Sequence, residues 1–340
     1  WWLTWLSIAV ITLMDELTSI FYAPAEAHRF IGNYAIAFIA LTSLLMRFLS
    51  TRMVEIAEIL EHHNIRGGGV YSFSYLVLGP TLSFIAVASI LVDYVLTACI
   101  STVSAVENGL TFIQLTQMEK YAIMFGIVWG IAGLNILGVK ENARFTFGIF
   151  FVVATVLLTL LASGLYEATP QSWGEIGNSY KFASKHVGEE GFFGGFAFII
   201  VAISGCILAY SGIESVVQTA GLVKSWKDIG KAYIFLAVTT GIFTPLISSL
   251  VLSSVLSPEE HETDLITQYA SMLNGEWFGW IVGGVASIAL IMAVNTAYVA
   301  SSELMERVAH RYNFHWIIAT NKRQSLYRIH MLSAVFFTII

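Results

Sequence analysis

Residues Met14 to Ala27 read MDELTSIFYAPAEA and place three carboxylates, Asp15, Glu16 and Glu26, in one of the most apolar parts of the chain. A charged side chain near the centre of a membrane costs about 2.5–3.5 kcal/mol on insertion scales, so an acid there is a functional candidate. Asp15 and Glu16 follow a nearly continuous apolar run, which at about 1.5 Å per residue puts them about 20 Å along a helix. The stretch therefore predicts a membrane helix with acids near mid-bilayer.

The composition of the whole chain is typical of a membrane protein. Of its 340 residues, 56% are hydrophobic and only 12% are charged, whereas about a quarter of the residues in soluble domains are charged. A helix crosses a bilayer with about 20 apolar residues, and such stretches recur along the sequence. The modest net charge of −6 argues against a nucleic-acid partner. We therefore expect an all-α integral membrane protein with the lipid bilayer as its surroundings.

Nine hydrophobic segments are expected, joined by short loops and by two longer polar connections at 167–192 and 257–276. The segments span 3–27, 33–58, 71–105, 119–137, 144–166, 193–222, 231–256, 277–303 and 329 onward. The first and the sixth are interrupted by polar residues, a spacing typical of transporters with two inverted five-helix repeats. We interpret 1–340 as one transmembrane transporter domain, with a first repeat at about 1–166 and an incomplete second repeat at about 193–340. Because the chain lacks a starting methionine and ends inside a hydrophobic run, we expect it to be a fragment.

The distribution of Lys and Arg predicts the orientation, because basic loops stay in the cytoplasm. With the amino terminus inside, eleven basic residues face the cytoplasm and four face the opposite side. The eleven are Arg66, Lys140, Arg144, Lys224, Lys227, Lys231, Arg307, Arg311, Lys322, Arg323 and Arg328, and the four are Arg29, Lys120, Lys181 and Lys185. We therefore expect a multi-pass protein of the cell inner membrane with a cytoplasmic amino terminus.

Oxygen-bearing side chains recur at helical spacing in three of the segments. At 3.6 residues per turn, spacings of three and four put such side chains on one face of a helix. The candidates are Asp15 and Tyr22 in the first segment, Tyr94, Thr97 and Ser101 in the third, and Ser211 and Glu214 in the sixth. Gly212, inside the sixth set, lies where a helix can unwind. These positions predict a polar site where the two interrupted segments meet.

Each candidate also has a structural interpretation. Hydroxyls in membrane helices usually bond a carbonyl of their own helix or a neighbouring helix. Arg47 and Arg52 are available as structural partners for Asp15 or Glu214. Glu16 lies off the Asp15 face, and we expect it to serve structure.

The stretch DELTSIFYAPAEA, residues 15–27, resembles the first-helix motif of the KUP/KimA-type potassium uptake proteins, within the amino acid–polyamine–organocation (APC) superfamily. The wider resemblance includes GGGVYSFSYLVLGP at 67–80, NILGVKENARF at 135–145 and NTAYVASSELMERVA at 295–309, and it covers almost the whole chain. It implies an all-α LeuT/APC-type inverted five-helix repeat with broken helices 1 and 6. It also implies a transporter rather than an enzyme, with potassium bound at the broken helices and driven inward with protons.

The resemblance carries over to individual residues. The family's ion-coordinating side chains match Asp15 and Tyr22, then Tyr94, Thr97 and Ser101, and finally Ser211, where the family has Thr, and Glu214. For proton coupling we expect Glu214 to carry the proton and Asp15 to bind the ion, although two such acids can titrate as a coupled pair. We expect no cofactor and no metal centre, only transported potassium and protons.

The acids of the first helix favour a cation over an amino acid. Amino acid transporters of the superfamily resemble one another in a glycine-rich break, where backbone N–H groups meet the substrate carboxylate. Here Asp-Glu-Leu-Thr-Ser takes its place, and a carboxylate about 4 Å from an acid is repelled by about 4 kcal/mol at an effective dielectric of about 20. A cation is instead stabilised by oxygen ligands, and an inside-negative potential favours its entry by about 2.3 kcal/mol per 100 mV.

Other functions stay open from the sequence. One is a proton-coupled amino acid or polyamine permease with the same fold, since polyamines tolerate acidic residues. Another is a sensor or scaffold subunit that binds without transport. The expected partners are a small cation or small-molecule substrate and the lipid bilayer, and a homodimer is left open.

Overall fold

The computed structural model describes residues 5–65, 69–138, 143–213, 215–218, 225–323 and 325–340. Within these ranges every regular element is a helix, and none is a strand. In chain order the elements are α1 (Trp5–Thr18), η1 (Ser19–Phe21), α2 (Ala23–Ile31), η2 (Gly32–Tyr34), α3 (Ala35–His62), α4 (Gly69–Gly109), α5 (Gln117–Ile136), α6 (Ala143–Glu167), α7 (Pro170–Glu189), α8 (Gly191–Cys206), η3 (Ile207–Tyr210), α9 (Ser215–Gln218), α10 (Trp226–Val238), α11 (Thr240–Leu252), α12 (Leu265–Asn274), α13 (Glu276–Arg311) and α14 (Tyr327–Ile339). The expected all-α class is confirmed.

Six stretches of the described residues are long and apolar enough to cross a membrane. They are Ala23–His62, Gly69–Gly109, Phe145–Glu167, Gly191–Tyr210, Trp226–Leu252 and Glu276–Arg311. The predicted segments at 119–137 and 329 onward form α5 and α14, which do not meet that criterion, and the segment at 3–27 is divided between α1 and α2. The crossing of the membrane by these three segments stays a prediction.

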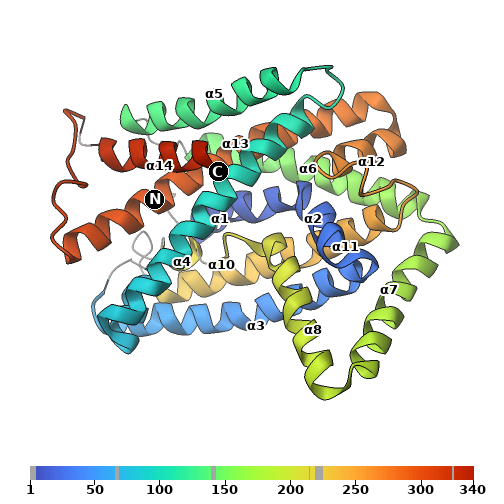
Figure 1. The fold of residues 1–340 in the computed structure, drawn as a ribbon, viewed down its shortest axis with the longest axis horizontal. Coiled ribbons are helices and arrows are strands. Elements are labelled where there is room, and N and C mark those ends of the chain that lie inside the picture. Colours follow the sequence, from blue (N-terminus) through green and yellow to red (C-terminus); the bar gives the residue numbers. More distant parts are fainter. Residues whose placement is uncertain (1–4, 66–68, 139–142, 214, 219–224, 324) are drawn as a thin grey trace.

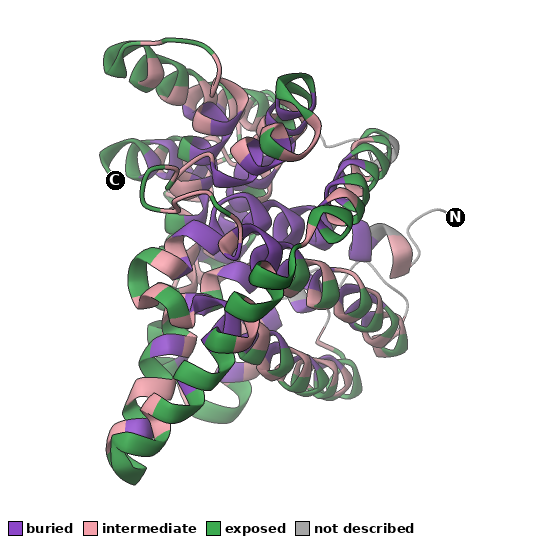
Figure 2. Ribbon diagram, turned by 90° about the vertical axis from the view of Figure 1, so that its right-hand side faces the viewer, coloured by how far each residue is buried: buried purple, intermediate pink, exposed green. Residues whose placement is uncertain are grey.

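Several helices, among them α3 and α5, run roughly along the long axis of the molecule, α4 crosses it obliquely, and α1 lies in the middle of the bundle (Figure 1). Buried residues gather in the interior, and exposed residues cover the outer helices (Figure 2). α4 and α13 approach each other closely, since a Cβ added to Gly283 would lie 2.3 Å from the carbonyl oxygen of Asn108. Glycine at this position therefore lets the two helix backbones touch.

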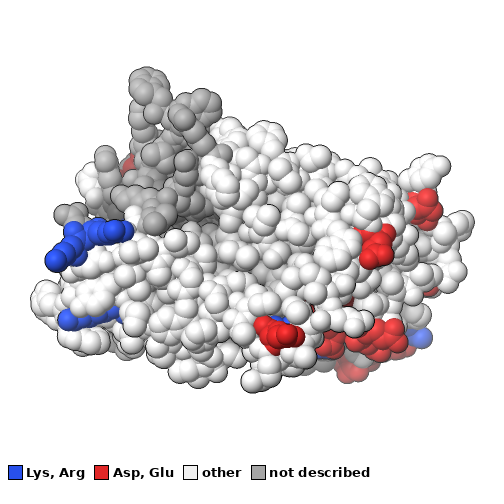
Figure 3. Space-filling view, turned by 90° about the horizontal axis from the view of Figure 1, so that it is seen from above, with Lys and Arg blue, Asp and Glu red and all other residues white. Residues whose placement is uncertain are grey.

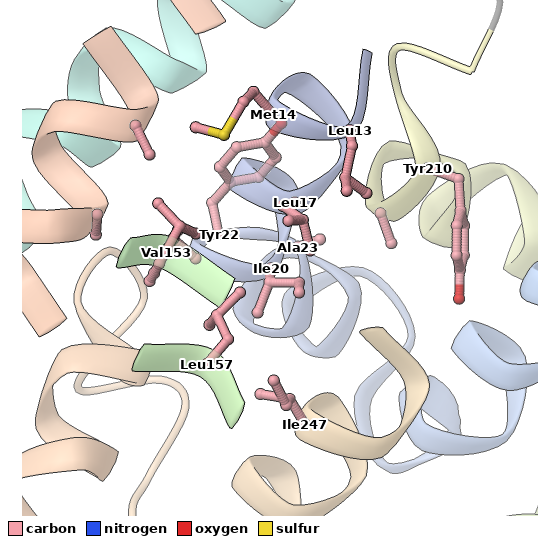
Figure 4. Packing of buried hydrophobic residues seen from close by; sticks show 14 of the residues in the cluster. Leu13, Met14, Leu17, Ile20, Tyr22, Ala23, Val153, Leu157, Tyr210 and Ile247 are labelled. Carbon is pink, nitrogen blue, oxygen red and sulfur yellow. The ribbon is translucent and has the colours of Figure 1, made fainter. Parts of the chain in front are cut away.

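Bulky side chains fix α1 and η1 inside this bundle. Leu17 and Phe21 are 4% and 1% exposed, so both belong to the apolar core. Figure 4 shows Ile20 close to Leu157 of α6, and the two residues belong to the same buried cluster. Full burial of such a side chain stabilises by about 1.5–3 kcal/mol, which offsets part of the cost of placing acids in the same segment.

Both predicted helix interruptions are present. α1 ends at Thr18 and is followed by the short η1, and Tyr22 then leaves the helical conformation before α2 begins. α8 ends at Cys206 and continues as η3, after which Gly212 adopts a positive φ of 96°. Two further interruptions are present: Gly79 inside α4 has φ 79° and ψ −179°, and Thr239 between α10 and α11 has φ −80° and ψ −85°.

The two parts of the chain expected to be polar connections contain helices. α7 occupies most of 167–192, because Thr169 caps its first turn and Pro170 suits a first helical position. The Ser179 hydroxyl of α7 donates a 2.6 Å hydrogen bond to the Asn33 carbonyl, which attaches α7 to η2. Likewise, α12 occupies the end of 257–276 and buries Ile266 completely. Figure 1 shows α7 and α8 forming a V at the lower right.

Charged side chains are distributed unequally along the molecule. On the face shown in Figure 3, Lys and Arg gather toward the left end, and most Asp and Glu lie toward the right. Such a separation is compatible with a basic cytoplasmic side and an acidic outer side. The sidedness itself stays a prediction.

Candidate functional site

The two broken helices touch each other at their interruptions. Ser19 in η1 is fully buried, and its hydroxyl lies 2.8 Å from the carbonyl oxygen of Ala209 in η3 and 2.6 Å from that of Glu16. A buried hydroxyl needs such partners, because an unsatisfied one costs about 1–3 kcal/mol. Ser19 therefore joins the interruption in the first segment to the one in the sixth.

The Asp15 carboxylate lies directly against the second interruption. Asp15 is 7% exposed on the last turn of α1, and a Cβ added to Gly212 would come within 2.6 Å of its Oδ2 atom. Gly212 also has a positive φ, which side chains other than glycine adopt only with strain. Glycine thus permits both the backbone conformation and the close approach of the acid.

The third predicted set of residues meets the same interruption through a pair of hydroxyls. Thr97 on α4 is 3% exposed, and its Oγ1 lies 3.2 Å from the Oγ of Ser211, which follows η3. Thr97 therefore bonds another segment rather than only its own helix. The contact brings α4 to the place where Asp15 meets Gly212.

Tyr22 belongs to the first interruption, and its side chain reaches α4. Its side chain is 2% exposed and lies in electrostatic range of both Asp15 and Asp93. Ser101 of α4, which is fully buried, lies next to the Tyr22 phenol. The phenol therefore adds an oxygen to the same region as the Asp15 carboxylate.

The remaining two candidates are Tyr94 and Glu214. Tyr94 is buried in a cluster with Tyr71, Val87 and Leu304. Glu214 lies outside the described residues. The structure thus brings together five of the seven candidates, namely Asp15, Tyr22, Thr97, Ser101 and Ser211.

The two arginines considered as structural partners have different surroundings. Arg52 forms an ion pair with Glu55 at 2.8 Å. The Arg47 guanidinium acts electrostatically on Glu16 and has no hydrogen-bond partner among the residues that the structure describes. The electrostatic interaction of Glu16 with Arg47 of α3 was not predicted from the sequence. Helical spacing predicts only that Glu16 and Asp15 point in different directions, not which helices they meet.

The assembled side chains present a carboxylate, a phenol and hydroxyls close to two interruptions, where backbone carbonyls are released from helical bonding. Oxygen sets of this kind replace the hydration shell of an alkali cation. No group of three His, Cys, Asp or Glu side chains is gathered in the described ranges. The arrangement is therefore suited to binding a monovalent cation.

Comparisons with known proteins are consistent with a membrane permease. A family model described as "Amino acid permease" matches residues 1–340. The chain is also 27% identical over 321 residues to "Potassium transporter KimA" of Bacillus subtilis (strain 168), and the alignment covers 90% of this chain. It covers 51% of that relative, so the chain spans about half the length of the relative.

Proposed function

Because the chain belongs to the amino acid permease family, we propose that it is a secondary active transporter that imports potassium by proton symport through alternating access. The proposed fold is the LeuT/APC-type inverted five-helix repeat with broken helices 1 and 6, supported by the interruptions at η1 and η3. The proposed location is the inner membrane with a cytoplasmic amino terminus, supported by the unequal distribution of Lys and Arg.

The observation that carries the proposal is the Asp15 carboxylate placed against Gly212, beside the Thr97 and Ser211 hydroxyls. In an amino acid site, the break offers backbone N–H groups to a substrate carboxylate. An acid at this break repels such a carboxylate and attracts a cation. The proposed ligands are Asp15, Tyr22, Tyr94, Thr97, Ser101, Ser211 and Glu214.

Similarity to a potassium transporter supports the choice of cation. The relative named for potassium transport is 27% identical to the chain across 90% of its length. Potassium is also weakly hydrated compared with smaller cations, and uncharged hydroxyl and carbonyl oxygens can replace its water shell. An Asp15 carboxylate among such groups supplies the balancing charge.

Proton coupling is assigned to the acids of the same region. Glu214 is proposed as the proton carrier and Asp15 as the ion ligand, with both able to take part in proton exchange. Two interacting acids release their protons in steps that belong to the pair. A pH-dependent uptake that requires both acids is the expected behaviour.

A second function is a proton-coupled amino acid or polyamine permease. It is favoured by the amino acid permease model, which matches the entire chain. In this function Asp15 would bind the amino group of the substrate rather than a bare ion. A polyamine suits the acid best, because it brings no carboxylate to the site.

Uptake by the intact protein in sealed proteoliposomes distinguishes the two functions. Labelled rubidium serves as the probe for potassium, and unlabelled potassium, a mixture of amino acids and a polyamine serve as competitors. We expect saturable rubidium uptake that potassium suppresses and amino acids leave unchanged. Accumulation of a labelled amino acid or polyamine without rubidium uptake would establish the second function instead.

A further inference from the structure

A second acid on α1 lies in a different environment from Asp15. Glu16 is 0% exposed and faces α11, where the Thr240 hydroxyl donates a hydrogen bond to its Oε2 atom. Its other oxygen, Oε1, is buried without a hydrogen-bond partner among the described residues. A buried carboxylate with an unused oxygen is costly to keep charged unless a cation compensates it.

The compensating cation is Arg47 of α3. Its guanidinium acts electrostatically on Glu16, and its Nε, Nη1 and Nη2 atoms are all buried with no acceptor in the described part of the chain. Gly241 makes room for it, since a Cβ there would lie 3.1 Å from Arg47 Nε. The two charges balance each other when Glu16 is ionised, and one net positive charge remains when Glu16 binds a proton.

Thr240 can satisfy both protonation states of Glu16. Its hydroxyl has two acceptors, Glu16 Oε2 and the Leu236 carbonyl oxygen at 2.9 Å, but only one proton to donate. It can donate to an ionised Glu16; when Glu16 holds a proton, the acid can donate to Thr240, which then donates to Leu236. Thr240 is the first residue of α11 and directly follows the break at Thr239. This change of hydrogen-bond partners therefore takes place at the junction of α10 and α11.

Other titratable groups lie on the elements packed against α1 and Glu16. Tyr210 of η3 is within its electrostatic range, but the Tyr210 hydroxyl donates to the Ile39 carbonyl at 2.9 Å. On α10, the Tyr233 hydroxyl donates to the Ile213 carbonyl at 2.9 Å. Asp15 is the neighbouring acid on α1 itself. The sequence of α11 contains no titratable residue, and that of α6 contains them only near its ends. Two helices that pack against α1 carry further charged or titratable residues: Lys227, Asp228 and Lys231 near the start of α10, and Glu276, Tyr298, Glu303, Glu306, Arg307, His310 and Arg311 on α13.

A row of hydroxyls extends from Glu16 along α11. Thr244 and Ser248 follow Thr240 at four-residue spacing and therefore continue its face of the helix. Both are 0% exposed, and neither hydroxyl has a hydrogen-bond partner among the residues described. The row leads toward Leu252, the end of α11 that precedes the acidic stretch 257–264 and is expected to face outward.

We propose that Glu16 is a proton-binding site, with Arg47 as its counter-charge and the α11 hydroxyls as its connection to the outer side. A proton from outer water forms an O–H bond at a Glu16 oxygen and is lost to the inner side after the conformational change, without any change of oxidation state. The inference rests on the proposed proton-coupled transport and adds to it a proton site separate from the cation site at Asp15.

Uptake of labelled rubidium by the intact protein, measured in mildly acidic and mildly alkaline buffer, tests this role. In Glu16→Gln, which mimics the protonated acid, we expect the ratio of the two rates to move from the wild-type value toward one, while Glu26→Gln, on the neighbouring α2, keeps the wild-type ratio. Thr240→Ser should keep the wild-type pH midpoint, and Thr240→Val should displace it. If Glu16→Gln keeps the wild-type ratio of uptake rates, the inference is overturned, and the result for Glu214→Gln does not change that conclusion.

Difference infrared spectra of the purified protein between the two buffers provide a readout that needs no transport. We expect the C=O band of a buried protonated carboxylic acid in the wild type and in Glu26→Gln, and its loss in Glu16→Gln. A band unchanged in Glu16→Gln overturns the inference. Absence of rubidium uptake by the wild type would instead overturn the proposed function, and the infrared band would still report on Glu16.

Discussion

The Thr97 hydroxyl lies 3.2 Å from the Ser211 hydroxyl and connects α4 to the second helix interruption. If the pair binds the transported cation, Thr97→Val and Ser211→Ala should each weaken apparent rubidium affinity about fivefold, because one net hydrogen bond or ligand contact is worth about 1 kcal/mol. The double variant should lose less than the product of the single losses, since the two residues act together.

Thr102→Val is the matched control for that cycle. Thr102 is a buried hydroxyl on the same helix, and it donates to the carbonyl of Ala98 in its own helix at 2.7 Å. We expect the rubidium affinity of Thr102→Val to equal that of the wild type. If the affinity loss in the double variant equals the product of the losses in Thr97→Val and Ser211→Ala, the two hydroxyls do not act as a pair.

Gly212→Ala should abolish uptake while leaving the protein in the membrane. The new Cβ would come within 2.6 Å of Asp15 Oδ2, and the positive φ would add strain of about 1–3 kcal/mol. Gly126→Ala on α5 is the control, because nothing lies within 4 Å of a Cβ at that position. Rubidium uptake and surface expression, measured together, separate loss of transport from loss of protein; wild-type uptake by Gly212→Ala would contradict the close packing described for Asp15.

Ser19→Ala tests the connection between the two interruptions. Removing the hydroxyl leaves the Ala209 carbonyl without its 2.8 Å partner, which should destabilise the fold by about 1 kcal/mol. We expect a lower thermal unfolding midpoint of the purified protein than in Ser204→Ala, whose hydroxyl bonds its own helix at Ile200 on the exposed side of α8. Equal midpoints in the two variants would mean that the Ser19 contact contributes no stability.

Long apolar segments were predictable from the sequence, because a membrane helix is specified largely by its own composition. The predicted segment 33–58 corresponds to α3 at Ala35–His62, and 277–303 corresponds to α13 at Glu276–Arg311. α7 was not recognised, since its overall composition resembles a polar loop. The spacing of apolar residues along 170–189 would have been a better guide than their number.

The site was predictable only in part. Helical spacing and family resemblance selected Thr97 and Ser211, which the structure places 3.2 Å apart. Neither spacing nor composition specifies which face of α1 meets which neighbour, so the partners of Glu16 became visible only through Thr240 and Arg47. Such contacts depend on tertiary packing between residues far apart in the sequence.

Equilibrium binding of rubidium to the purified intact protein tests the central claim most directly. Asp15→Asn keeps the size of the side chain and removes its charge, whereas Glu26→Gln makes the same change at a partly exposed acid that pairs with Arg29. We predict that Asp15→Asn weakens rubidium binding by at least about tenfold, equivalent to about 1.4 kcal/mol, and that Glu26→Gln binds like the wild type. Wild-type rubidium affinity in Asp15→Asn would contradict the account.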